Sequence, residues 1–93
     1  MIPKREKIRM EETAEWLKLL ANPVRLCIIR QLAKSGEKNV SDITDCMEVG
    51  QSCVSQNLGR LKRAGLVDNR KEGLNVIYYI KDKRIIPILE ILF

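Results

Sequence analysis

The stretch that decides the fold is residues 50–66, which read GQSCVSQNLGRLKRAGL. On a helical wheel, Val54, Leu58 and Leu61 fall on one side and predict a helix that packs on a domain through this face. The opposite side holds Ser52, Ser55, Gln56, Gly59 and Arg63. Solvated helix faces usually favour Glu and Lys, which propagate a helix better than Ser and Gly do. The face is instead typical of a helix that reads base edges in the major groove of DNA.

Three further helices are predicted before this one. Residues 11–20 start acidic and then gain an apolar stripe, as an amphipathic helix does. Asn22 is suited to cap a second helix and Pro23 to be its first residue. This helix is apolar on most of its faces, which predicts a central, buried position. It is expected to end near Gly36. We expect Ser41 to cap a short third helix.

The remainder of the chain predicts a hairpin and a final helix. Residues 66–71 and 75–81 read as two strands around Gly73, because apolar side chains alternate along the second of them. Residues 83–93 return to helical spacing, with Pro87 in the first turn or at the true start. The expected fold is mainly α with a small β-hairpin, a winged helix-turn-helix in one domain spanning residues 1–93. Residues 41–65 would form the helix-turn-helix, and residues 66–81 the wing.

Composition narrows the classes of protein that the sequence can represent. The 93 residues suffice for one compact domain, and a net charge of +5 favours an anionic partner such as nucleic acid. No apolar run reaches membrane-spanning length and the charged N-terminal segment lacks a signal-peptide core, so we expect a cytoplasmic protein without a membrane partner. Histidine is absent, and no Gly-rich phosphate loop or CxxC motif occurs. We therefore predict no catalytic residue and no enzyme activity.

Two motifs together resemble a known family. The segments LKLLANPVRLCIIRQL and QSCVSQNLGRLKRAGLV, with a hairpin ending in IYY, are similar to the ArsR/SmtB family of bacterial and archaeal transcriptional repressors. The resemblance covers about residues 16–80. It implies a dimeric winged helix that binds an operator palindrome, with residues 51–64 as the reading helix and the loop around Gly73 as the wing. The base-reading positions that it implies are Gln51, Ser52, Ser55 and Gln56, while Asn57 stands where His is commoner.

The sequence departs from this family at its metal sites. Asn39 and Ser41 occupy the positions of the usual pair of cysteines, and the last helix offers only Glu90 as a ligand for the other site. One sulfur-sensing pattern of the family pairs a cysteine on the second helix with one on the last helix. Cys27 lies on the second helix here, but the last helix has no cysteine. We predict no metal site and no cofactor.

The cysteines leave several interpretations open. Cys27 lies among aliphatic residues and is expected to behave as a small hydrophobic side chain. Cys46 and Cys53 flank the turn of the helix-turn-helix, where they could form a redox pair. The alternative is two partly buried cysteines without a redox role, which is the more usual case because disulfides are uncommon in the cytosol. On the wheel, Cys53 falls beside Asn57 and Arg60, between the packed and the reading face. Three thiolates could also hold a soft metal ion.

The hypothesis is a homodimeric transcriptional repressor that binds a double-stranded DNA operator. The last segment is too apolar all round for solvent, so residues 83–93 and 10–21 are expected to be dimerisation helices. The expected phosphate contacts are Arg60, Lys62, Arg63, Arg70, Lys71 and Asn75. The alternatives are a winged-helix dimer that acts as a protein-interaction module, a small thiol redox enzyme, and a thiophilic metal or metalloid sensor with a non-standard cysteine site.

Overall fold

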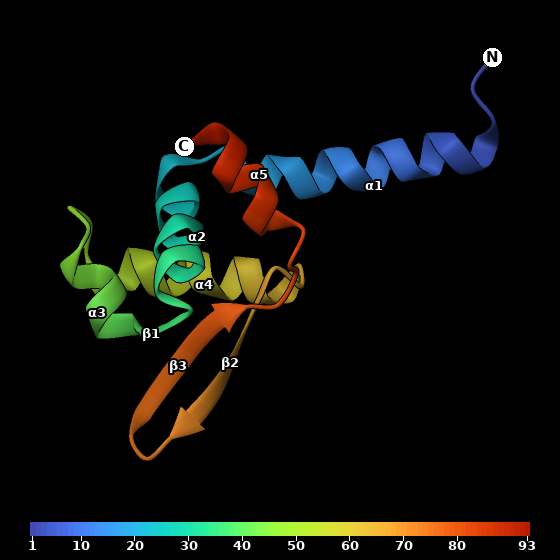
Figure 1. Cartoon of the computed structure of the whole chain (residues 1–93). Helices are drawn as coiled ribbons and strands as arrows, with labels where there is room; N and C mark the ends of the chain where they lie inside the picture. Colours follow the sequence, from blue (N-terminus) through green and yellow to red (C-terminus); the bar gives the residue numbers. More distant parts are fainter.

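A computed structural model describes residues 1–93 and confirms the predicted mainly α, winged helix-turn-helix fold. In chain order the elements are α1 (Lys4–Leu20), α2 (Pro23–Ser35), β1 (Glu37–Asn39), α3 (Val40–Asp45), α4 (Gln51–Arg63), β2 (Val67–Glu72), β3 (Asn75–Ile80) and α5 (Ile85–Leu92). Figure 1 shows α4 and the β2–β3 hairpin on one side of the molecule and α5 on the opposite side, with α1 extending away from the body. No helix has both the length and the apolarity that a membrane span requires.

The sheet has three strands rather than the two predicted. Its order is β1-β3-β2 with antiparallel neighbours, and the predicted hairpin is found within one residue at its ends. The added strand β1 is only three residues long and pairs with β3, Glu37 opposite Tyr79 and Asn39 opposite Ile77. So short a segment carries no readable alternation, which is why the sequence did not reveal it. Gly73 has φ +62° in the two-residue turn of the hairpin, a conformation that favours glycine.

The predicted helix signals are mostly confirmed, with one error. The Asn22 side chain accepts hydrogen bonds from the backbone N–H groups of Val24 and Arg25, at 2.9 and 3.1 Å, and so caps α2 as expected. The cap of α3 is Asn39, whose Oδ1 accepts from the Asp42 N–H at 2.7 Å. The assignment of this cap to Ser41 was wrong because α3 begins at Val40, which places Ser41 inside the helix.

α1 begins earlier than predicted. The sequence suggested a start near residue 10 or 11, but the basic residues before that point continue the helix back to Lys4. Lys, Arg and Glu are all good helix formers, which explains the extension. Every residue from 1 to 15 is exposed, so the first turns of α1 contact little of their own chain.

The core is aliphatic and has α2 at its centre, as predicted. Ile28, Ile29 and Leu32 of α2 are completely buried. They belong to one cluster with the buried face of α4 and with residues from α3, the sheet and α5. Pro87 lies in the first turn of α5, as expected. This core holds α4 by one face only and leaves its other face free.

Candidate nucleic-acid interface

The two faces of α4 differ as the helical wheel predicted. Val54, Leu58 and Leu61 have no exposed surface. The four side chains expected to read bases, Gln51, Ser52, Ser55 and Gln56, are all exposed. None of the four forms a side-chain hydrogen bond within the chain, as the bonds present involve other residues. Their donors and acceptors therefore face solvent, where an external partner can reach them.

Basic side chains continue this face toward the end of α4. Arg60, Lys62 and Arg63 are exposed and form no ion pair, and Lys62 Nζ lies 3.4 Å from Asn69 Oδ1 of β2. Gly59 leaves room for Arg63, because a Cβ there would lie 3.3 Å from its Nη1. These cations lie on the last two turns of the helix, next to the polar face and close to the wing. Phosphate oxygens are the groups that such unpaired cations favour in DNA.

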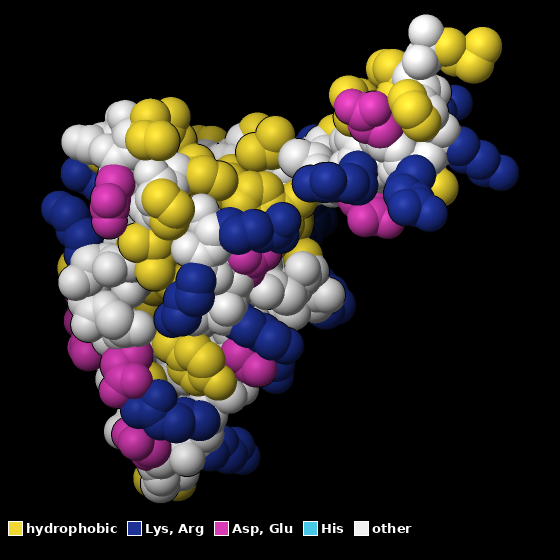
Figure 2. All heavy atoms as spheres, turned by 45° about the vertical axis from the view of Figure 1, so that its right-hand side comes forward, with side chains coloured by type: hydrophobic (Ala, Val, Ile, Leu, Met, Phe, Trp, Pro, Cys, Tyr) yellow, Lys and Arg dark blue, Asp and Glu magenta, His cyan; other side chains and the backbone are white.

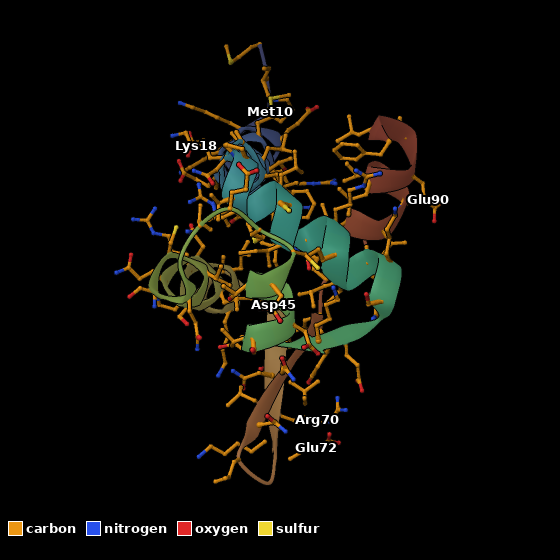
Figure 3. The ribbon with its side chains drawn as sticks, turned by 90° about the vertical axis from the view of Figure 1, so that its left-hand side faces the viewer. Met10, Lys18, Asp45, Arg70, Glu72 and Glu90 are labelled. Carbon is orange, nitrogen blue, oxygen red and sulfur yellow. The ribbon has the colours of Figure 1, made fainter.

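Arg70 has a different environment from the other predicted phosphate contacts. Its guanidinium donates two hydrogen bonds to the Glu37 carboxylate, at 2.8 and 2.7 Å, and one to Glu72 at 3.2 Å. Figure 3 shows Arg70 and Glu72 next to each other on the hairpin. The hydrogen bonds from Arg70 lower the pKa of Glu37, and Glu37 raises the pKa of Arg70. In the free chain Arg70 is therefore paired with two carboxylates, unlike the other cations that are predicted to contact phosphate.

The tip of the wing presents four exposed side chains, and one of them, Glu72, is paired with Arg70. Lys71 and Asn75 are exposed as expected and flank the turn. Leu74, which the sequence reasoning missed, is fully exposed at 104% of its reference surface. The sequence did contain a signal for this exposure, because a large apolar residue in a two-residue hairpin turn has no core in which to be buried.

The three cysteines are free thiols in separate places. Cys53 is half-buried beside Asn57, whose Nδ2 lies 3.6 Å from its Sγ, which agrees with the helical wheel. Cys46 is exposed, with Lys38 Nζ 3.6 Å from its Sγ. Cys27 is only half-buried, and Gln31 Nε2 lies 3.7 Å from its Sγ. No three His, Cys, Asp or Glu side chains lie where they could hold a metal ion together.

Sequence comparison places this geometry among known regulators. The model of the family described as bacterial regulatory proteins of the arsR family matches residues 22–69, from the cap of α2 into β2. An uncharacterized HTH-type transcriptional regulator of Methanocaldococcus jannaschii is 39% identical over 83 residues, which cover 89% of this chain and 93% of that protein.

Solved structures are similar over almost the whole chain. The transcriptional repressor PagR of Bacillus anthracis has a TM-score of 0.82 at 31% identity, covering 94% of this chain and 99% of that one. A homodimeric winged helix-turn-helix DNA-binding domain from Mycobacterium bovis, described as a possible ArsR-family transcriptional regulator, has a TM-score of 0.80 at 31% identity. That match covers 98% of this chain and 86% of that one.

Proposed function

This chain belongs to the ArsR family of regulatory proteins and is a DNA-binding transcriptional repressor, and from that premise we propose that it acts as a homodimer on a palindromic operator. The observation that carries the proposal is the contrast between the two faces of α4. One face is completely buried, while the other is an exposed row of small polar side chains with no partner in the chain. Such a helix is positioned to enter the major groove.

In this proposal each residue type has a distinct task. Gln51, Ser52, Ser55 and Gln56 contact base edges, where Gln can bond an adenine through two groups at once and Ser can donate or accept. Arg60, Lys62, Arg63 and Lys71 contact phosphates, and Asn75 contacts the backbone from the wing. Arg70 is left out of this set because Glu37 and Glu72 already satisfy its guanidinium.

The apolar surfaces of α1 and α5 support a homodimer. Ile91, Leu92 and Phe93 at the end of α5 are 85%, 60% and 60% exposed, and Leu17 of α1 is 47% exposed. Figure 2 shows hydrophobic side chains gathered on the side of the molecule that holds α5 and the body end of α1. An exposed helix as apolar as α5 is unfavourable in water, and a second copy would cover it. Figure 1 shows α5 on the other side of the body from the β2–β3 hairpin, so a dimer formed through α5 would leave the wing uncovered.

A thiol signal is a second proposal, and it concerns control of the same activity. Cys46 is exposed at the turn between α3 and α4, and Cys53 contacts Asn57 within α4. Oxidation at either sulfur adds bulk at the element that has to fit the groove. We propose that such a change weakens operator binding.

The proposed function is tested by selecting bound duplexes from a random DNA pool with the purified protein. We expect an enriched palindrome whose Kd rises steeply with salt, as phosphate contacts require. A variant with Ser55→Glu places a negative charge on the reading face and should abolish enrichment. Ser35→Glu, an exposed serine at the end of α2, is the matched control and should not. Failure to enrich any palindrome, with weak binding that is insensitive to salt, would favour the protein-interaction alternative.

A further inference from the structure

Arg25 joins the end of α1 to the middle of α4. Its Nε donates a hydrogen bond to the Leu19 carbonyl at 2.7 Å, and its Nη2 lies 3.5 Å from the Lys18 carbonyl. These carbonyls belong to the last turn of α1, where a helix cannot satisfy all of its own acceptors. The remaining arm of the guanidinium, Nη1, donates to Asn57 Oδ1 on α4 at 3.2 Å. One half-buried side chain therefore holds two helices together.

Asn57 is held from both ends of its amide group. Its oxygen faces Arg25, because a guanidinium has donors only and no acceptor. Its Nδ2 donates to the Cys53 carbonyl, one turn earlier in α4, at 2.9 Å. Asn57 is half-buried, and both polar atoms of its side chain are engaged within the chain.

This bridge is the only side-chain hydrogen bond that connects α4 to another helix. The other bonds made by side chains of α4 stay within the helix or run from Lys62 to Asn69 in β2. Apart from this bridge, α4 packs against the other helices through the buried aliphatic cluster. Apolar packing has little directionality and permits small rotations, whereas a hydrogen bond weakens steeply when its angle changes. The orientation of α4 relative to α1 therefore depends strongly on Arg25 and Asn57.

We propose that Arg25 and Asn57 are positioning residues that determine which spacing of operator half-sites the dimer accepts. The inference rests on the proposed function, in which α1 belongs to the dimer interface and α4 reads the DNA. Lys18, labelled in Figure 3, marks the end of α1 that Arg25 contacts. The two reading helices of a dimer must match half-sites about one helical turn of DNA apart. A bridge from the dimerisation helix to the reading helix sets that separation.

The test measures binding to a set of duplexes that carry the selected half-sites. The separation of the half-sites is optimal, or changed by one or two base pairs in either direction. The proteins are the wild type, Asn57→Leu, which keeps a similar shape without hydrogen bonds, and Arg25→Lys, which cannot reproduce the planar fork. The matched control is Asn69→Leu, because Asn69 also accepts from a cation of α4 but connects it to β2 rather than to α1.

We expect the wild type and the control to prefer the optimal spacing over a two-base-pair change by about tenfold, the equivalent of one charge-assisted hydrogen bond. In Asn57→Leu and Arg25→Lys the preference should fall to about threefold or less. A purely stabilising role would instead lower the Tm and raise Kd equally for all spacings, and that result would overturn the inference.

Two further outcomes separate this inference from the proposed function. A wild type that binds the half-sites without any spacing preference would overturn the role of Arg25 and Asn57 alone. A wild type that binds no duplex would overturn the proposed function. Should Asn57→Leu fail to fold, Asn57→Asp keeps the acceptor for Arg25 and loses the donor to Cys53, so it should retain the spacing preference.

Discussion

Replacing Lys71 with Gln should make DNA binding less dependent on salt, whereas removing the charges of its neighbour Arg70 and of the Arg70 partner Glu37 together should not. Both residues lie on β2 near the tip of the wing, and the sequence alone treats them alike. In the structure Lys71 is exposed and has no ion-pair partner. Arg70 forms ion pairs with Glu37 and Glu72 at 2.7 and 3.2 Å. A protein cation releases a counterion from DNA only when it neutralises a phosphate, and a cation that stays paired with carboxylates of its own chain does not do so.

The size of the effect follows from how many DNA phosphates the variant leaves without a cation. In a homodimer, Lys71→Gln frees two phosphates, and each contributes about 0.9 to the slope of log Kd against log salt, so the slope falls by about 1.8. Between 50 and 200 mM salt this lowers the change in Kd by about twelvefold. For Arg70 the matched change is the double variant Glu37→Gln with Arg70→Gln, which keeps the net charge. Its slope should equal that of the wild type.

Fluorescence anisotropy with the labelled operator, measured at several salt concentrations in that interval, gives each slope directly. Circular dichroism confirms that each variant remains folded. If the double variant flattens the slope as much as Lys71→Gln does, the Arg70 ion pairs must open on DNA, and the reasoning from the free structure is refuted. An unchanged slope for Lys71→Gln would show that the wing does not contact phosphate through this residue.

Three further outcomes are expected. Gln56→Ala should cost about 1–3 kcal/mol on the operator and blur the preference at particular base pairs; a repeated DNA selection measures this, and an unchanged preference would mean that the reading face has been misassigned. Ile91→Lys combined with Leu92→Lys should give a folded monomer with weak operator binding, because both side chains are exposed in the single chain; analytical ultracentrifugation that still finds a dimer would exclude the end of α5 from the interface. A mild oxidant should weaken operator binding by the wild type, and Cys46→Ser or Cys53→Ser should reduce that response; equal binding by all three proteins with and without oxidant would leave the thiols as structural residues.

Much of the fold could be predicted from the sequence because its signals are local. The spacing of Val54, Leu58 and Leu61 identifies the buried face of α4 from within a single helix, and the structure agrees. The Asn22 cap and the hairpin turn around Gly73 likewise depend on a few neighbouring residues. The winged helix-turn-helix order and the exposed polar face of α4 follow from these periodicities and end signals.

Only the tertiary structure decided which polar side chains are free and which are engaged. Arg70 and Glu37 are 33 residues apart, and Arg25 and Asn57 are 32 residues apart. No periodicity connects such residues, since their contact depends on how β1 pairs with β3 and how α2 packs on α4. The sequence by itself determined which helix presents an exposed polar face opposite a buried apolar one. The packing of distant elements determined how that helix is oriented and which cations remain unpaired, because a hydrogen bond forms only after the chain has brought its two partners together.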